Sequence, residues 1–263
     1  MTEITISLGQ MHIIPDDVEQ NIASFKQMSA QAAAEGSSVL VVPELWSTGY
    51  VLEQAEHFAS EQDGGIYDVI RETAHEHNLT IIGSVLEKVA NGVANSLSVI
   101  KPDGKISGVY RKLHLFRLFD EEKYLQQGND LLTLDMEWGA TGFGICYDLR
   151  FPELFRRYSI QNGARVMILP AEWPLIRVNH WRSLLIARAI ENQSFVIACN
   201  AAGKSGETVF GGHSMIIDPW GEIIVEGDEN PALLTATIDT QAIVDISTKI
   251  PVFDDVRGDI YSV

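Results

Sequence analysis

Residues 142–157 read GFGICYDLRFPELFRR, an apolar run that ends at a cysteine and is followed by charged residues and a proline. The run up to Cys146 predicts a buried strand, and Pro152 suits the first turn of a helix, where a missing amide hydrogen is tolerated. In this arrangement the Cys146 thiol would lie near a helix N-terminus, where backbone N–H groups are unpaired and the helix dipole is positive. The stretch therefore predicts a strand, a short turn and a helix, the repeating unit of an α/β fold.

The same alternation continues on both sides of this stretch. Residues 95–112 hold two alternating runs joined by Pro102, Asp103 and Gly104, a pattern typical of a β-hairpin. The predicted strands elsewhere cover residues 4–10, 38–44, 79–87, 140–146, 165–170, 194–200, 213–226 and 232–238, and the predicted helices begin near residues 18, 67, 152 and 179. We expect helices that cover one mixed sheet or a pair of sheets, in a single domain over residues 1–263.

Composition narrows the class of protein. The 263 residues are 46% hydrophobic and 21% charged, and the formal net charge is −17. Because nucleic acid and anionic membranes both need a positive face, neither is an expected partner. The N-terminal residues resemble no signal peptide, and no apolar run approaches the roughly 18 to 20 residues that span a bilayer. Two cysteines predict no disulfide framework, and we expect a cytoplasmic protein.

Cys146 has two interpretations. A thiol attacks carbon only as a thiolate, so a catalytic cysteine needs a neighbour that removes its proton or lowers its pKa. Free cysteine is also among the most buried residue types, so a cysteine that closes an apolar strand can simply belong to the core. We interpret Cys199, inside the apolar run FVIAC, as a core residue.

Two other predicted strands end at charged residues. Glu44 follows the apolar run VLVVP, and Lys112 follows GVYR among apolar neighbours. A carboxylate that takes the thiol proton, an ammonium that stabilises charge on oxygen, and the thiol of Cys146 would together attack an amide. The alternative is a structural salt bridge between Glu44 and Lys112.

Five stretches, taken in order, resemble the nitrilase superfamily, the carbon-nitrogen hydrolases, over nearly the whole chain. They are VVPELWSTGY (41–50), YRKLHLF (110–116), CYDLRFPELFR (146–156), HWRSLLIARAIENQ (180–193) and GHSMIIDPWGEII (212–224). The resemblance implies a four-layer α-β-β-α sandwich that forms a homodimer and acts on a small-molecule amide. It implies neither a metal nor an organic cofactor.

The resemblance also assigns roles to residues. It implies a catalytic triad of Glu44, Lys112 and Cys146, with the backbone N–H of Tyr147 stabilising the oxyanion. The family has a second glutamate a few residues before a glycine. Counting back from the glycine in DEEKYLQQG favours Glu121, with the adjacent Glu122 as the alternative.

The resemblance is strongest to the omega-amidase type, which hydrolyses the terminal amide of 2-oxo acids such as 2-oxoglutaramate. Arg150 would bind a substrate carboxylate, unless it pairs with Asp148 or Glu153. Glu172 and Trp173 would line the pocket, although Trp173 could equally serve packing. An amidase or N-carbamoyl hydrolase of another small substrate, and a non-catalytic oligomeric module of the same fold, are the alternatives.

Sequence signals for other chemistries are missing. No GxGxxG or GxxxxGK[ST] motif supports dinucleotide or nucleotide binding. The HEHN stretch at 75–78 places its histidines two residues apart, which does not put both on one helix face for zinc. The sequence context of papain-like cysteine proteases is also absent.

Overall fold

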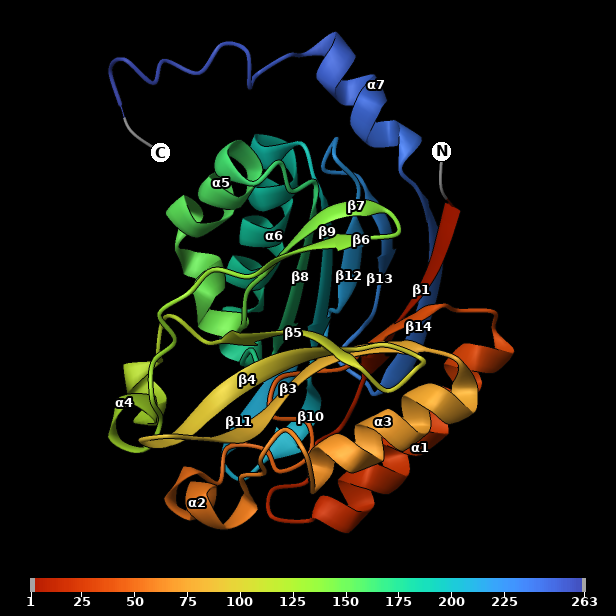
Figure 1. The fold of residues 1–263 in the computed structure, drawn as a ribbon, viewed down its shortest axis with the longest axis vertical. Helices are drawn as coiled ribbons and strands as arrows, with labels where there is room; N and C mark the ends of the chain where they lie inside the picture. The colour runs from red at the N-terminus through yellow and green to blue at the C-terminus, as the bar shows by residue number, and fades with distance from the viewer. Residues whose placement is uncertain (1–2, 262–263) are drawn as a thin grey trace.

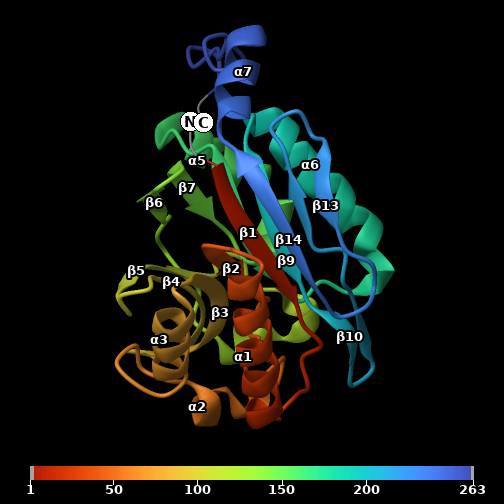
Figure 2. The ribbon, with the colours of Figure 1, turned by 90° about the vertical axis from the view of Figure 1, so that its right-hand side faces the viewer.

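The computed structural model describes residues 3–261 and contains two stacked six-stranded sheets with helices on their outer faces (Figure 1, Figure 2). The first sheet has the order β14-β1-β2-β3-β4-β5, and the second has the order β13-β12-β9-β8-β7-β6. This is the expected α-β-β-α sandwich.

The strands of the first sheet are β1 (Glu3–Gln10), β2 (Val39–Val41), β3 (Thr80–Val89), β4 (Gly92–Ile100), β5 (Ile106–Arg111) and β14 (Ala232–Asp239). Parallel pairs join β1 to β2 and β2 to β3, and the remaining neighbours are antiparallel. The helices α1 (Val18–Ala34) and α3 (Ile66–His77) lie on its outer face (Figure 1).

The strands of the second sheet are β6 (Thr133–Met136), β7 (Gly139–Phe143), β8 (Val166–Ala171), β9 (Phe195–Asn200), β12 (Met215–Ile217) and β13 (Ile223–Glu226). Its central strands β7, β8 and β9 are parallel. The helices α5 (Pro152–Gln161) and α6 (Val178–Asn192) cover its outer face (Figure 1). The remaining elements are the helices α2 (Ala55–Phe58), α4 (Glu121–Tyr124) and α7 (Gln241–Lys249), the hairpin β10 (Ala202–Ser205) and β11 (Thr208–Gly211), and the short 3₁₀ turns η1 (Leu52–Gln54), η2 (Arg117–Phe119), η3 (Cys146–Arg150) and η4 (Leu175–Arg177).

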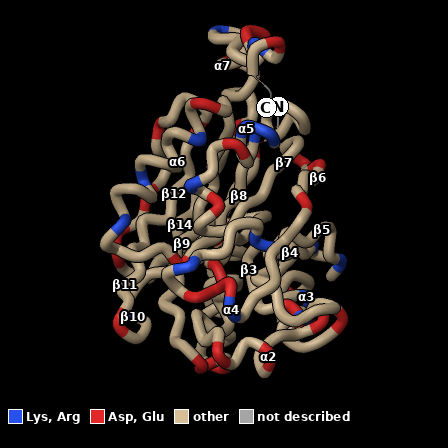
Figure 3. The backbone as a smooth tube through the Cα atoms, turned by 90° about the vertical axis from the view of Figure 1, so that its left-hand side faces the viewer, with Lys and Arg blue, Asp and Glu red and all other residues tan. Residues whose placement is uncertain are grey.

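Apolar side chains fill the space between the two sheets. Leu8 and Val41 of the first sheet belong to the same buried cluster as Ile168 and Ile197 of the second. Burying apolar surface at about 25 cal/mol per Å² makes this layer the main stabilising contact of the fold. Charged residues lie mainly in the outer helices, turns and loops (Figure 3).

Helix α1 illustrates how local sequence fixes an element. The side chain of Asp17 accepts a hydrogen bond from the backbone N–H of Gln20 at 3.0 Å and so caps the helix. Phe25 and Ala32 are buried on one face, as the spacing predicts.

The predicted strands that carry the candidate residues are shorter in the structure. β2 ends at Val41, so Glu44 lies in the turn beyond it, and β7 ends at Phe143. Helix α5 begins at Pro152 as predicted, but Cys146 opens the separate 3₁₀ turn η3. The thiol therefore lies at a sharp turn between strand and helix, six residues before α5 begins.

Candidate active site

Three candidate residues meet although they come from distant parts of the chain. Glu44 follows β2, Lys112 follows β5, and Cys146 follows β7 of the other sheet. All three are buried, with Cys146 the most accessible at 6% exposure. The sequence reasoning based on strand ends therefore identified side chains that are neighbours in space.

The Glu44 carboxylate is held on both oxygens. Its Oε1 accepts hydrogen bonds from Lys112 Nζ at 2.7 Å and from Asn95 Nδ2 at 2.8 Å, and its Oε2 accepts one from the backbone N–H of Glu172 at 2.9 Å. The next residue, Leu45, has a φ of +43°. Such a backbone costs about 1 to 3 kcal/mol and is typical of sites where geometry is imposed.

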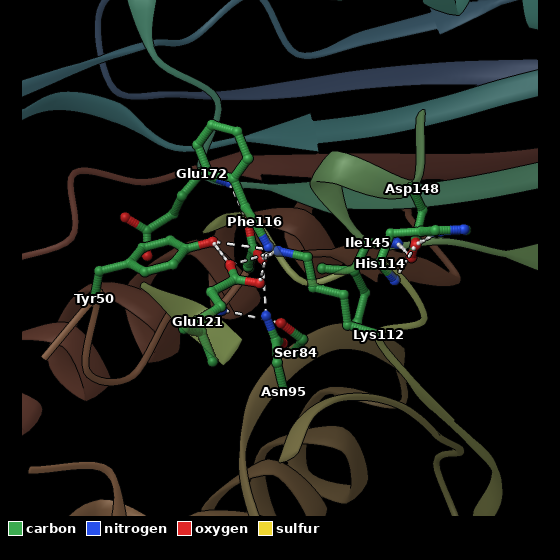
Figure 4. A network of polar contacts seen from close by, with 12 residues as sticks. Tyr50, Ser84, Asn95, Lys112, His114, Phe116, Glu121, Ile145, Asp148 and Glu172 are labelled. Atoms are coloured by element: carbon green, nitrogen blue, oxygen red, sulfur yellow. Dashed lines mark hydrogen bonds and ion pairs between the residues drawn. The ribbon is translucent and has the colours of Figure 1, made fainter. Parts of the chain in front are cut away.

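The Lys112 ammonium lies between two carboxylates (Figure 4). Its Nζ donates to Glu44 at 2.7 Å and to Glu121 Oε1 at 2.6 Å, and Tyr50 Oη lies 3.4 Å away. Burial lowers the pKa of Lys112, but the charges of Glu121 and Glu44 outweigh burial and raise it overall. Lys112 is therefore a permanent cation in the protein interior.

The structure distinguishes the two adjacent glutamates by position. Glu121 is fully buried, whereas Glu122 is exposed. Glu121 accepts hydrogen bonds from Lys112, from Tyr50 Oη at 2.7 Å and from the backbone N–H of Phe116 at 2.8 Å. Burial raises the pKa of Glu121, and the Lys112 charge acts in the opposite direction.

Asn95 and Tyr50 join this network and were not predicted from the sequence. Asn95 lies in β4, where a polar side chain in an alternating strand is typical of a solvent-facing position. In the structure it is fully buried and donates to Glu44. Tyr50 lies in the same stretch as Glu44, residues 41–50, and this position was the only sequence feature that could have pointed to it.

Cys146 has a strained backbone and a protonated thiol. Its φ is +45°, in the left-handed region that residues other than glycine rarely adopt. Burial and the Glu44 carboxylate raise the pKa of the Cys146 thiol more than the Lys112 charge lowers it. A neutral thiol next to a carboxylate is the resting state that base-assisted attack requires.

Asp148 fixes the turn that presents Cys146 (Figure 4). Its Oδ2 accepts hydrogen bonds from the backbone N–H of Ile145 at 2.9 Å and from Tyr110 Oη at 2.7 Å. Its Oδ1 accepts one from the backbone N–H of His114 at 3.0 Å and lies 2.7 Å from His114 Nδ1. Asp148 therefore ties the cysteine turn to β5 and the loop after it.

A pocket with an empty volume of about 280 Å³ opens next to Cys146. It is lined by Tyr50, Phe116, Phe119, Cys146, Tyr147, Arg150, Glu172, Trp173, Pro174 and Arg177. Five of these lining residues were predicted from the sequence, whereas Arg177, in the turn η4 shortly after Trp173 and Pro174, was not.

Arg150 lies over the Trp173 ring, with its Cζ 4.7 Å from the ring centroid, and approaches His180 Nδ1 at 3.5 Å. Asp148 is fully engaged with the cysteine turn, and within residues 3–261 neither it nor Glu153 forms an ion pair with Arg150. The guanidinium is thus available to a ligand.

Glu172 is buried beside the Glu44 network, and both of its carboxyl oxygens lack a hydrogen-bond partner in the described part of the chain. Figure 4 draws contacts at its backbone N–H but not at its carboxyl group. Burial and the Glu44 charge raise the pKa of Glu172 well above its usual range. Burial and the neighbouring Glu44 charge therefore both favour the protonated form of Glu172.

Two further properties complete the description of residues 3–261. No group of three or more histidine, cysteine or acidic side chains in this range is arranged to hold a metal ion. Within the same range, no helix combines the length and the apolar character needed to cross a bilayer.

The profile of one family, described as carbon-nitrogen hydrolase, matches residues 5–247. The chain belongs to the carbon-nitrogen hydrolase family. It is therefore a hydrolase, and its fold is the sandwich that solved carbon-nitrogen hydrolases share. The crystal structure of XC1258 from Xanthomonas campestris, a CN-hydrolase superfamily protein with an arsenic adduct in its active site, has a TM-score of 0.92 at 30% identity and covers 97% of this chain and 98% of its own.

Two named relatives match this carbon-nitrogen hydrolase over nearly their whole length. A 2-oxoglutaramate amidase from Bacillus subtilis is 41% identical over 258 residues, which are 98% of this chain and 99% of that protein. The human omega-amidase NIT2 is 32% identical over 275 aligned residues, covering 100% of this chain and 98% of its own.

Proposed function

We propose that the protein is an omega-amidase that hydrolyses the terminal amide of a 2-oxo acid, such as 2-oxoglutaramate, and releases ammonia. The observation that carries the proposal is the Cys146 thiol in the lining of a pocket, beside the buried Glu44 and Lys112 pair. The 41% identity to a 2-oxoglutaramate amidase over nearly the whole chain supports this choice of substrate.

The proposed acylation begins with Glu44 as general base. As the Cys146 sulfur attacks the amide carbon, its proton passes to Glu44, and the amide oxygen becomes negative. The Lys112 ammonium and the backbone N–H of Tyr147 stabilise that oxygen. Glu44 then gives the proton to the nitrogen, the C–N bond breaks, ammonia leaves, and the acyl group remains on sulfur as a thioester.

The proposed deacylation uses water as the nucleophile. Glu44 or Glu121 removes a proton from water as its oxygen attacks the thioester carbon. The C–S bond breaks, the proton returns to Cys146, and the acid is released. Neither half-reaction needs a redox change.

Arg150 supplies the proposed contact to the far end of the substrate. Its side chain lines the pocket and has no acidic partner within residues 3–261. A guanidinium binds a carboxylate through two parallel hydrogen bonds. Trp173, under Arg150, forms part of the same wall, and we also assign Glu172 to substrate binding.

The two cysteines allow a matched test of the nucleophile. We expect Cys146→Ala to abolish ammonia release from 2-oxoglutaramate while circular dichroism stays unchanged. Cys199, buried in β9, provides the control, and Cys199→Ala should keep turnover. Mass spectrometry of acid-quenched enzyme should find the acyl adduct on Cys146. Wild-type turnover in Cys146→Ala would refute the proposed mechanism.

Two alternatives lead to different results in the same assays. An N-carbamoyl amino acid also ends in a carboxylate that Arg150 could bind. Ammonia release measured over a panel of 2-oxo acid amides and N-carbamoyl amino acids distinguishes an N-carbamoyl hydrolase from an omega-amidase. A non-catalytic module would show no preferential alkylation of Cys146 over Cys199 by iodoacetamide.

The proposal also includes a single domain over residues 1–263, a cytoplasmic location and a homodimer. Both cysteines are free thiols in the structure, which is compatible with a reducing compartment. Light scattering of the purified protein measures the oligomeric state directly.

A further inference from the structure

The pocket beside Cys146 contains a second cation that the proposed function does not use. Arg177 lines this pocket together with Arg150. It belongs to the turn η4, directly before helix α6. Its guanidinium lies 6.0 Å from the centroid of the Phe116 ring, and within residues 3–261 it forms no ion pair.

We propose that Arg150 and Arg177 together bind the carboxylate and 2-oxo group of the substrate and select 2-oxo acid amides against the corresponding amino acid amides. This inference rests on the proposed function, because it names the device by which that site would choose its substrate. Arg177 is then a specificity residue that takes no part in breaking the C–N bond.

Trp173 contacts both arginines, Arg150 through its side chain and Arg177 through its backbone. Its ring lies under the Arg150 guanidinium, and its indole Nε1–H donates to the backbone carbonyl of Arg177 at 2.9 Å. Trp173 is itself fixed, since its backbone N–H donates to Asn200 Oδ1 at 2.6 Å and only 3% of the residue is exposed. Preorganised donors lose less entropy when the substrate binds.

The charges around the pocket favour an anion and disfavour an ammonium group. Two guanidinium groups line the pocket, and burial and the nearby Glu44 raise the pKa of Glu172, the one carboxyl group in the lining. The carboxylates of Glu44 and Glu121 are already paired with Lys112. The two guanidinium groups would repel the α-ammonium of glutamine, whereas a keto oxygen would accept their hydrogen bonds.

The test compares 2-oxoglutaramate with glutamine, which differ only at the α-carbon. We expect Arg177→Gln to raise KM for 2-oxoglutaramate by about ten- to a hundredfold with kcat changed less than about threefold, since a hydrogen bond to a charged group is lost. The ratio of kcat/KM for the two substrates should fall at least about tenfold. Arg177→Lys keeps the positive charge but loses the paired N–H donors of the guanidinium group, so its KM should lie between those of wild type and Arg177→Gln. Arg182 on α6 is the control, because it is paired with Glu226 and does not line the pocket.

A second readout does not depend on turnover. The protein is alkylated with iodoacetamide, and labelling of Cys146 is followed by mass spectrometry with 2-oxoglutarate or glutamate as protectant. We expect 2-oxoglutarate to slow labelling in wild type and in Arg182→Gln, much less in Arg177→Gln, and glutamate to protect weakly throughout.

The outcomes separate the two proposals. If wild type hydrolyses 2-oxoglutaramate but Arg177→Gln keeps both KM and protection, the selection by two arginines is wrong and the amidase proposal stands. If wild type fails on every 2-oxo acid amide but protection by 2-oxoglutarate needs Arg177, the amidase proposal fails and the anion site stands. Absence of both turnover and protection overturns both.

Discussion

Replacing Asp148 by alanine should both destabilise the protein and slow the reaction, although Asp148 would not touch the substrate. Its carboxylate is fully buried and holds the backbone N–H groups of Ile145 and His114 and the hydroxyl of Tyr110. The turn that it holds carries Cys146 with a φ of +45°. Without this anchor the turn can relax, and the thiol moves away from Glu44.

The expected loss of stability in Asp148→Ala follows from the hydrogen-bond donors that lose their acceptor. Ile145 is fully buried and Tyr110 is 1% exposed, so water cannot replace the lost acceptor at either group. Each buried unsatisfied donor costs about 1 to 3 kcal/mol, which gives roughly 2 to 6 kcal/mol for Asp148→Ala. In Asp148→Asn the amide can donate to the Tyr110 hydroxyl, so one backbone N–H remains unsatisfied and the loss is about 1 to 3 kcal/mol.

Urea unfolding followed by fluorescence measures the free energy of unfolding, and ammonia release measures turnover. A displaced nucleophile should lower kcat by about ten- to a hundredfold in Asp148→Ala. Asp135 in β6 is exposed, and Asp135→Ala should stay within about 0.5 kcal/mol of wild type. If Asp148→Ala were as stable and as active as this control, the anchoring argument would be refuted.

Three further predictions concern the surroundings of the site. Glu121→Gln should lower kcat at least about tenfold, because Lys112 loses a carboxylate partner, while Glu122→Gln should match wild type; equal effects in the ammonia assay would contradict the assignment. Gly128→Ala should cost about 1 to 3 kcal/mol in urea unfolding because its Cβ would overlap the last carbonyl of β5, and Gly64→Ala, with open space, should be neutral. Burial raises the pKa of the Glu87 carboxyl group, but the hydrogen bonds that it accepts lower the pKa overall. Glu87 therefore stabilises the folded protein above its usual pKa, and this stabilisation is lost as the pH falls through the lowered pKa. The free energy of unfolding, measured from pH 6 down to about pH 3, should therefore fall less steeply in Glu87→Gln than in wild type. The same slope in both proteins would show that Glu87 does not contribute to the pH dependence.

Local pattern in the sequence predicted most strands and helices and the central residues, but it left open whether the chain forms one mixed sheet or a pair of sheets. Apolar runs located most strands, and charged residues directly after them located Glu44 and Lys112. The α-β-β-α fold expected from the family resemblance is confirmed. The roles assigned to these residues stay predictions that the experiments above test.

Other features depend on contacts that no local pattern encodes. Asn95 has the polar character of an exposed strand position, yet it is buried and donates a hydrogen bond to the Glu44 carboxylate. Asp148 was considered as a partner of Arg150, but it accepts hydrogen bonds from the cysteine turn instead. Short elements such as α4, which contains both Glu121 and Glu122, are too brief for periodicity to show which side chain points inward.

The antiparallel pairing of β1 with β14 sets Glu3 opposite Asp239 and Gln10 opposite Ala232. During synthesis the ribosome releases β1 long before β14 exists, so the side of β1 that faces β14 stays unpaired while most of the polypeptide is made. An unpaired strand is a template for wrong partners, and contacts this distant in sequence form slowly. The first sheet is therefore complete only when β14, the last strand in the sequence, has been made.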